Sequence, residues 1–224
     1  MTAPRIALIS AVPTAMAPAA EALREGFPEA EVWHLLDDRL LSDADEQGGL
    51  TATLRARMHR LIEHAVRGGA DAVLLTCSLY GVVAQEAAGG VAVPVLAPDQ
   101  AAFEQIAAGG LRHVLVVASF EAALRDSVDR LRTVLASSAP APGVEVSGLV
   151  VPEAKAVTAA GERDRLVSVL VEGVSAAIAD ADAVFLAQYS LAPAARALAA
   201  ALEMPVVSGP ASAASVLRTL LSGP

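Results

Sequence analysis

Two short segments share a sequence pattern that constrains the fold of this chain more than any other feature. The first reads Asp71-Ala-Val-Leu-Leu-Thr-Cys77 and the second reads Asp182-Ala-Val-Phe-Leu-Ala-Gln188, at a constant offset of 111 residues (182 − 71 and 188 − 77). In both, an aspartate precedes a short apolar run and polar residues follow it. Such a run predicts a buried parallel strand that presents polar side chains at its carboxyl end. The same offset relates Pro94-Val-Leu-Ala97 to Pro205-Val-Val-Ser208, which indicates an internal repeat.

Strand-like and helix-like segments alternate along each half of the chain. The opening strand, 5–10, and its counterpart, 112–119, both end in serine. Because parallel strands need crossover connections, this alternation predicts an α/β fold of two similar lobes, each a parallel sheet flanked by helices. We expect residues 1–97 to form the first lobe and 98–209 the second, with a terminal helix at about 210–224 that can pack back on the first. Ligands of such sheets bind beyond the carboxyl ends of the strands, so we expect an active-site cleft between the lobes.

Two further expectations concern local structure. The segment 39–49 is polar, acidic and contains glycine, which predicts a surface loop. Gly-Gly pairs at 68–69, 89–90 and 109–110 follow helical runs, where glycine supplies a left-handed cap without a Cβ penalty. A phosphate-binding loop needs its glycines between a strand and a following helix, so these pairs do not indicate a nucleotide site.

Composition excludes several classes of partner. The chain of 224 residues has a net charge of −9, which is opposite to the basic surface of a nucleic-acid-binding protein. It shows no polybasic membrane patch, no export signal and no apolar stretch of the ~20 residues that span a bilayer. A single cysteine cannot form an internal disulfide and suits a reducing compartment. We therefore predict a cytoplasmic protein without nucleic-acid or membrane partners.

The repeated segments resemble those of the aspartate/glutamate/hydantoin racemase superfamily. The resemblance covers nearly the whole chain, and its specific part is Thr76-Cys77-Ser78 in the first half and 186–190 in the second. It implies two cysteines, one per lobe, facing opposite sides of a substrate carbon with no metal or organic cofactor. One thiolate removes a proton and the other thiol returns one. The resemblance also makes a homodimer plausible, and it extends to arylmalonate decarboxylases and maleate isomerases, some of which use fewer cysteines.

The chain departs from this pattern at the second cysteine position, which Gln188 occupies. Losing one acid–base partner removes an effect of about 10²–10⁴ in rate, which disfavours symmetrical two-base racemisation. One thiol can still protonate the enediolate left by a decarboxylation, or add reversibly to an activated double bond so that the bond can rotate. The Gln188 amide can donate to a substrate carboxylate or a developing oxyanion; the alternative is a hydrogen-bonded residue at a strand end.

Cys77 is the expected catalytic residue. A thiol has an ordinary pKa of about 8.5, which a helix N-terminus can lower, and the segment after Cys77 leads into a predicted helix. The alternative is an inert buried cysteine, because cysteine is among the most buried residue types. With Gln188, the expected substrate-binding residues are hydroxyls at the predicted strand ends: Ser10, Thr76, Ser78, Tyr80, Ser119, Tyr189 and Ser190.

These hydroxyls, with backbone N–H groups at helix N-termini, can hold a small carboxylic acid without arginine, although any one of them could instead be a helix N-cap. Asp37 and Asp38 follow a predicted strand and could supply a base or form a solvated turn. His59 and His64 lie five residues apart on a predicted helix, without the companions of a metal site, so we predict no metal.

The sequence thus predicts a cofactor-independent, racemase-like isomerase that acts at the carbon next to a carboxylate of a small acid. An arylmalonate-type decarboxylase and a maleate-type cis–trans isomerase are alternatives within the same chemistry. A non-catalytic small-acid-binding protein derived from a racemase is the alternative from a different class.

Overall fold

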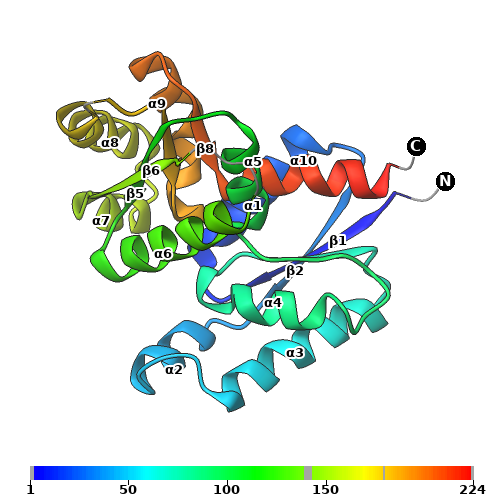
Figure 1. Ribbon diagram of the computed structural model, residues 1–224. Helices are drawn as coiled ribbons and strands as arrows, with labels where there is room; N and C mark the ends of the chain where they lie inside the picture. Colours follow the sequence, from blue (N-terminus) through cyan, green and yellow to red (C-terminus); the bar gives the residue numbers. More distant parts are fainter. Residues whose placement is uncertain (1–2, 139–142, 179, 223–224) are drawn as a thin grey trace. The chain divides into compact units, whose positions relative to one another are not determined.

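The protein contains two compact units, each built around a four-stranded parallel sheet (Figure 1). The structure is a computed structural model that describes residues 3–138, 143–178 and 180–222. The first unit comprises Met1–Gln100 and Ala213–Pro224, and the second comprises Ala101–Ser212. The predicted α/β fold, with two parallel sheets flanked by helices, is confirmed.

The sheet of the first unit has the strand order β2-β1-β3-β4, with all neighbours parallel. Its strands are β1 (Arg5–Ser10), β2 (Glu31–Leu36), β3 (Ala72–Leu75) and β4 (Val95–Leu96). Its helical segments are η1 (Pro13–Ala15), α1 (Met16–Gly26), α2 (Leu40–Glu46), α3 (Ala52–Arg67), η2 (Ser78–Tyr80), α4 (Gly81–Ala87) and most of α10 (Gly209–Leu221).

Apolar side chains cover both faces of this sheet. Ile9 of β1 packs in one cluster with Met58 of α3 and residues of α4, all fully buried. The neighbouring residue Leu8 is equally buried and points to the other face, because successive side chains of a strand alternate. On that face lie α1 and α10 (Figure 1), and they approach closely: a Cβ atom at Gly26 would lie 3.0 Å from the Cβ of Ala214.

The second unit repeats the arrangement, with the strand order β6-β5-β7-β8 and parallel neighbours throughout. Its strands are β5 (His113–Ala118), β6 (Glu145–Val150), β7 (Ala183–Leu186) and β8 (Val206–Ser208). Its helical segments are α5 (Gln100–Ala108), α6 (Glu121–Ser137), α7 (Glu153–Ala159), α8 (Arg163–Ala177), η3 (Tyr189–Ala194) and α9 (Ala195–Leu202).

Two apolar clusters cover the faces of the second sheet. Leu186 of β7 packs with residues of α7, α8 and α9, while Phe185, the preceding residue, packs with α5 and α6 on the other face. There the rings of Phe103 and Phe185 meet edge to face at 5.4 Å. Both central strands are therefore buried on both faces, which explains their uninterrupted apolar sequences.

The expected surface loop at 39–49 is wrong, because α2 occupies most of it. Leu40 and Ala44 of α2 are fully buried one turn apart, and the Tyr80 hydroxyl donates a 2.9 Å hydrogen bond to the Leu40 carbonyl oxygen. Burial of two apolar side chains on one helical face stabilises a segment whose composition alone favours a loop.

The glycine caps are confirmed at two of the three Gly-Gly pairs. Gly69 (φ 84°) and Gly110 (φ 66°) are left-handed, whereas neither Gly89 nor Gly90 has a positive φ. Helix α4 instead runs into Ala88, which keeps right-handed helical dihedrals, and a Gly90 N–H to Ala87 carbonyl hydrogen bond of 2.9 Å closes the turn.

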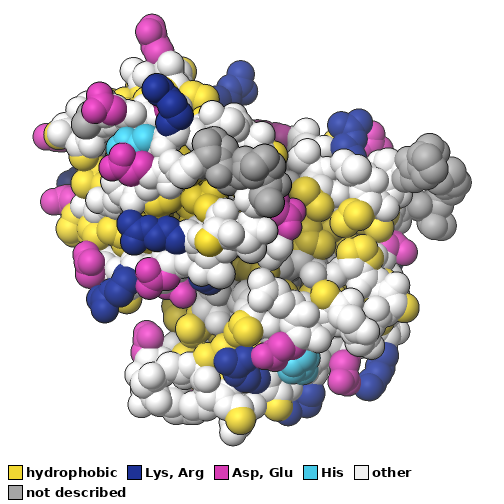
Figure 2. Space-filling view, in the orientation of Figure 1, with side chains coloured by type: hydrophobic (Ala, Val, Ile, Leu, Met, Phe, Trp, Pro, Cys, Tyr) yellow, Lys and Arg dark blue, Asp and Glu magenta, His cyan; other side chains and the backbone are white. Residues whose placement is uncertain are grey.

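Acidic and basic side chains are interspersed over the face of the molecule shown in Figure 2. Among the described helices, none combines the length and the apolar character that crossing a bilayer requires.

Candidate active site

Cys77 lies at the carboxyl edge of the first sheet, two residues beyond the buried strand β3. The N–H of the intervening Thr76 donates to the Ile9 carbonyl oxygen at 3.0 Å, which extends the pairing of β3 with β1. Cys77 itself has extended dihedrals (φ −119°, ψ 118°), and its carbonyl oxygen accepts a hydrogen bond from the Tyr80 N–H at 3.0 Å. Cys77 is partly exposed, and its side chain packs against the apolar cluster of the first unit.

Ser10 and Thr76 hold each other behind this edge. The Thr76 hydroxyl donates to Ser10 Oγ at 2.9 Å, and the two residues are 4% exposed or less. Their hydroxyls link the carboxyl ends of β1 and β3 beneath Cys77. The structure therefore brings Ser10, Thr76, Cys77 and Ser78 together at one edge, as the sequence predicted for strands in one sheet.

A buried carboxylate beside Cys77 was missed by the sequence analysis. The Ser78 hydroxyl donates to Asp99 Oδ2 at 2.7 Å, and Asp99 is only 1% exposed. Asp99 follows β4, and β4 pairs with β3. The signal that could have found it is the pairing of β4 with β3, because parallel strands bring the residues that follow them to the same edge.

The Tyr80 hydroxyl does not lie at the carboxyl edge of the first sheet. Its side chain is fully buried, and the hydroxyl is used by the Leu40 carbonyl oxygen. Burial, followed by the nearby Cys77 and the carboxylates of Asp37 and Asp43, raises the pKa of Tyr80 to about 12, against an opposing effect of Arg57. We therefore assign Tyr80 to holding α2 against η2 and leave it out of the proposed site.

Asp37 lies at the carboxyl end of β2 in a partly buried ion-pair network. Arg57 of α3 contacts Asp37 through Nε and Nη2, both at 2.6 Å, and contacts Asp43 through Nη1 at 2.8 Å. Burial works against the charged guanidinium, but the hydrogen bonds to the two carboxylates outweigh it and raise the pKa of Arg57. Asp37 is thus paired rather than solvated, whereas Asp38 is exposed.

In the second unit, Gln188 lies where the repeat places Cys77. It has extended dihedrals (φ −139°, ψ 138°), and its carbonyl oxygen accepts the Leu191 N–H at 3.0 Å. Its side-chain Oε1 accepts the Ser119 N–H at 2.7 Å, which orients the amide. Within the described part of the chain Nε2 has no hydrogen-bond partner, so the amide keeps two N–H donors.

The remaining predicted site residues lie around Gln188. Ser119 is buried at the carboxyl end of β5 and uses its backbone N–H to hold Gln188. Tyr189 is buried and Ser190 is partly buried, both within η3. The carboxyl edge of the second sheet thus carries an amide and hydroxyls, and no thiol.

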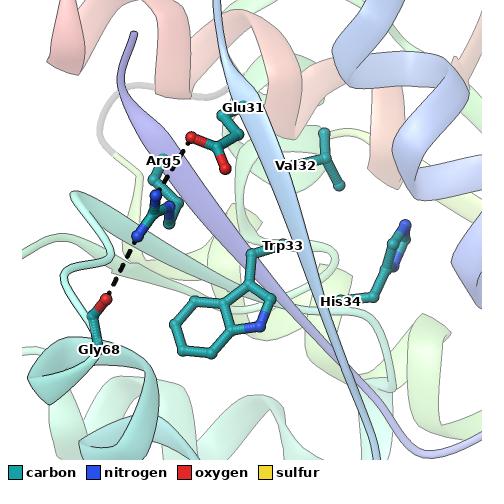
Figure 3. Close-up of a pocket in the computed structure, with 6 residues that line it drawn as sticks. All are labelled: Arg5, Glu31, Val32, Trp33, His34 and Gly68. Carbon is teal, nitrogen blue, oxygen red and sulfur yellow. Dashed lines mark hydrogen bonds and ion pairs between the residues drawn. The ribbon is translucent and has the colours of Figure 1, made fainter. Parts of the chain in front are cut away.

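A pocket of about 240 Å³ lies elsewhere in the first unit, against the edge strand β2 (Figure 3). It is lined by Arg5, Glu31, Val32, Trp33, His34 and Gly68. The Arg5 guanidinium contacts Glu31 at 3.3 Å and the Gly68 carbonyl oxygen at 3.4 Å. The strands β1 and β2 begin here, and Cys77 follows the opposite end of a strand parallel to them, so this pocket is separate from the thiol.

The described residues contain no group of three or more His, Cys, Asp or Glu side chains placed to hold a metal ion. What the first edge offers is a thiol, hydroxyls and one buried carboxylate. This set can donate or accept a proton, or form a bond through sulfur.

Comparison with known proteins gives a family and a fold. The family model described as Asp/Glu/Hydantoin racemase matches residues 13–217, while no curated protein sequence matches the chain significantly. An aspartate racemase of Picrophilus torridus has a similar structure, with a TM-score of 0.73 at 12% identity over 97% of this chain and 94% of that one.

Two other solved structures extend the comparison. An allantoin racemase of Klebsiella pneumoniae has a TM-score of 0.66 at 19% identity, over 98% of this chain and 88% of that one. A glutamate racemase of Francisella tularensis, solved in complex with D-glutamate, has a TM-score of 0.67 at 14% identity, over 99% of this chain and 82% of that one. Identities this low show a common fold alone.

Proposed function

This chain belongs to the Asp/Glu/hydantoin racemase family, and from that premise we propose that it is a cofactor-independent isomerase or lyase acting at the carbon next to a carboxylate. Cys77 is the thiol that transfers the proton or adds to the substrate. One observation carries the proposal: the only cysteine of the chain lies partly exposed at the carboxyl end of a central strand, where ligands of parallel sheets bind.

The substitution at Gln188 favours one-thiol reactions over two-thiol racemisation. An amide does not exchange protons usefully near neutral pH, whereas its N–H groups can stabilise a carboxylate or an enediolate oxygen. With Oε1 fixed by the Ser119 N–H, Nε2 provides those donors. Decarboxylation with protonation by Cys77, or reversible addition of Cys77 to an activated double bond, needs only one sulfur atom.

The substrate class we propose is a small carboxylic acid or a related amide. The similar structures belong to aspartate, glutamate and allantoin racemases, and one of them holds D-glutamate. In this chain the Ser78 hydroxyl is already donated to Asp99, so the donors that we propose for such a molecule are the Gln188 amide and the hydroxyls of Ser119 and Ser190.

The test uses solvent deuterium and carbon dioxide as independent readouts. The protein is incubated in D₂O with amino acids, hydantoins, malonates and maleate, and we follow deuterium at the α-carbon by mass spectrometry, CO₂ release, and cis–trans conversion by NMR. At least one reaction is expected, and Cys77→Ala and Cys77→Ser should slow it by at least about 10²-fold, the usual lower bound for loss of an acid–base group.

Ser168→Ala serves as the matched control, because Ser168 lies on α8 and, among the residues that the structure describes, bonds only the Asp164 carbonyl oxygen of its own helix. Circular dichroism and thermal unfolding confirm that each variant is folded. Full activity of a folded Cys77→Ala protein would exclude the thiol from the reaction.

The presence of Gln188 also supports a second function, a binding protein that holds a small acid without transforming it. A ligand that raises the melting temperature of the protein, without deuterium exchange, CO₂ release or isomerisation, would favour this second function.

A further inference from the structure

Strand β2 is an open edge of the first sheet. The Glu31 N–H donates to the Pro4 carbonyl oxygen at 2.8 Å and therefore points toward β1. Because successive backbone groups of a strand point to alternate sides, the N–H and C=O groups of Val32, His34 and Leu36 point away from β1. The strand order ends at β2, and within the described residues these outward groups have no hydrogen-bond partner.

The side chains of β2 carry none of the usual devices that prevent an edge from pairing. The strand contains no lysine and no proline, and its register with β1 is unbroken by a bulge. At its end Leu36 is 41% exposed. The pocket along β2 leaves space on both sides of the strand, with Glu31 and Trp33 on one side and Val32 and His34 on the other (Figure 3). A long, exposed and mostly apolar edge of this kind favours pairing with a further strand.

The other edges of the two sheets are short or covered. Strands β4 and β8 have only two and three residues. Strand β6 is as long as β2, but its Glu145 N–H points to the Arg112 carbonyl oxygen beside β5, so Val146 points outward. The Val146 carbonyl oxygen accepts a hydrogen bond from Arg132 of α6 at 2.8 Å, which covers this edge. Among the described strands, β2 alone is both long and open.

We propose that two copies of this protein associate through β2, antiparallel and about a two-fold axis at Trp33. An open edge needs another open edge as its partner, and a second copy of the chain supplies an identical one. Around this axis, Val32 exchanges backbone hydrogen bonds with the partner's His34, and the reverse pair does the same. The two four-stranded sheets thereby become one sheet of eight strands.

The charges and the aromatic ring of the edge select this register. An axis at Trp33 places the two indoles directly opposite each other and Glu31 opposite the partner's Leu35. Aromatic pairs across strands are favourable. An axis at His34 would instead place Glu31 opposite the partner's Asp37, and like charges directly opposite each other are destabilising.

Sedimentation equilibrium of the intact protein tests the association. A pair of six-residue strands buries less than the roughly 1,200–2,000 Å² of a stable interface, so we expect a dissociation constant on the order of micromolar. The mass should rise from the 22.7 kDa of one chain toward twice that value as the concentration increases from about 1 to about 300 µM. Trp33 is the only tryptophan, and its emission should shift to shorter wavelength over the same range, because pairing excludes water from the indole.

Two variants block the edge without touching its bonds to β1. Leu36→Lys places a charge there, and Val32→Pro removes an outward N–H, which an edge strand tolerates. Both should remain monomeric at the highest concentration. Leu220→Lys is the matched control, because Leu220 is another exposed apolar residue of the same unit, on α10, and this variant should associate as the unmodified protein does. Circular dichroism and thermal unfolding confirm that each variant is folded.

A disulfide measures the register. In a Cys77→Ala background, Trp33→Cys places two sulfur atoms at directly opposite positions, within reach of a disulfide, and mild oxidation should give a covalent dimer. His34→Cys in the same background places its Cα atoms about 8 Å apart or more, too far for a disulfide, and should stay monomeric under the same oxidation.

Three results would overturn the proposal. They are a monomer at every concentration of the unmodified protein, a dimer that persists in folded Leu36→Lys and Val32→Pro proteins, and cross-linking of His34→Cys in place of Trp33→Cys. The first result can be read even if a variant does not fold. None of these measurements uses a substrate, so they are independent of the reaction proposed for Cys77.

Discussion

The carboxyl edges of the two sheets have the same backbone and different side chains. Cys77 and Gln188 are both extended, both follow the third strand of their unit, and both lead into a 3₁₀ helix. The pairing of the third with the fourth strand has the same separation of 22 residues in each unit, Val73 with Val95 and Val184 with Val206. Yet the first unit carries a thiol at Cys77 and a buried carboxylate at Asp99, and the offset of 111 residues places Pro210 where Asp99 would stand.

This difference shows that the repeated fold places a residue at the same position in each unit, and that the identity of its side chain determines what the position can do. In the second unit, Gln188 Oε1 accepts a hydrogen bond from the Ser119 N–H, which stabilises the carboxyl edge of that sheet. In the first unit, the Thr76 hydroxyl donates to Ser10 Oγ and links the carboxyl ends of β1 and β3. Under the proposed function, the first position serves chemistry and the second serves structure and ligand binding.

The largest expected effect is that substitution of Cys77 mainly lowers turnover, whereas substitution of Gln188 mainly lowers stability. Cys77→Ala should lower turnover by about 10²–10⁴-fold, because it removes the acid–base group, with little loss of stability from a partly exposed side chain. Gln188→Ala should lower turnover less. It leaves the buried Ser119 N–H without its acceptor, and should cost about 1–3 kcal/mol in the free energy of unfolding. Turnover assays and urea unfolding give the two readouts.

Gln188→Glu is the matched control for this comparison. A carboxylate keeps the acceptor for the Ser119 N–H and removes the two amide donors, so stability should be retained while ligand affinity falls. If Gln188→Ala instead lost as much turnover as Cys77→Ala at full stability, the division between the two positions would be wrong.

The next effect concerns Tyr80, which corresponds to the apolar residue Leu191 in the second unit at the same offset of 111. Tyr80→Phe removes the hydrogen bond to the Leu40 carbonyl oxygen and should cost about 1 kcal/mol near neutral pH. Because the pKa of Tyr80 is raised from 10.0 to about 12, its contribution to stability is complete below pH 10 and is lost as the pH rises toward 12.

That linkage amounts to roughly 2–3 kcal/mol over the interval. Urea unfolding of both proteins from pH 8 upward measures it, and the advantage of the unmodified protein over Tyr80→Phe should disappear and then reverse as the pH approaches 12. A constant difference at every pH would show that the Tyr80 hydroxyl is not held in its neutral form by burial.

The sheets and their central strands could be predicted from the sequence, because a strand that is buried on both faces has a continuous run of apolar residues. Helix α2 could not, since its stability depends on Leu40 and Ala44 packing in a core assembled from distant segments, and on a hydrogen bond from Tyr80. The composition of the segment itself reveals neither the packing nor the hydrogen bond. Tertiary packing therefore overrides the preference for a loop.

The candidate site was predictable in position and less so in detail. Strand ends locate Cys77 and Gln188, because parallel strands carry their following residues to one edge. The sequence does not give the direction of a side chain in a turn, so Tyr80 was expected to bind substrate when its hydroxyl points into the core. Asp99 was missed because its place at this edge depends on the pairing of β3 with β4, which the sequence around Asp99 does not reveal.

The smallest expected effect lies at the opposite ends of the same strands, where Asp71 and Asp182 precede β3 and β7. Asp71 accepts one backbone N–H, from Arg5 at 2.7 Å, whereas Asp182 accepts two, from Arg112 at 2.7 Å and from His113 at 2.9 Å. The hydrogen bonds from the Arg112 and His113 N–H groups, in that order, lower the pKa of Asp182.

A group with a lowered pKa contributes stability above its unfolded value, near pH 4, and loses it as the pH falls through the folded value. Asp182→Asn should therefore lower the melting temperature at pH 7 more than Asp71→Asn does, because it weakens two backbone hydrogen bonds and the 3.3 Å ion pair with Arg112 instead of one backbone hydrogen bond. The melting temperatures of the Asp182→Asn and unmodified proteins should converge as the pH falls below 4. Equal losses for the two variants at pH 7 would mean that neither the second N–H nor the Arg112 ion pair adds stability at Asp182.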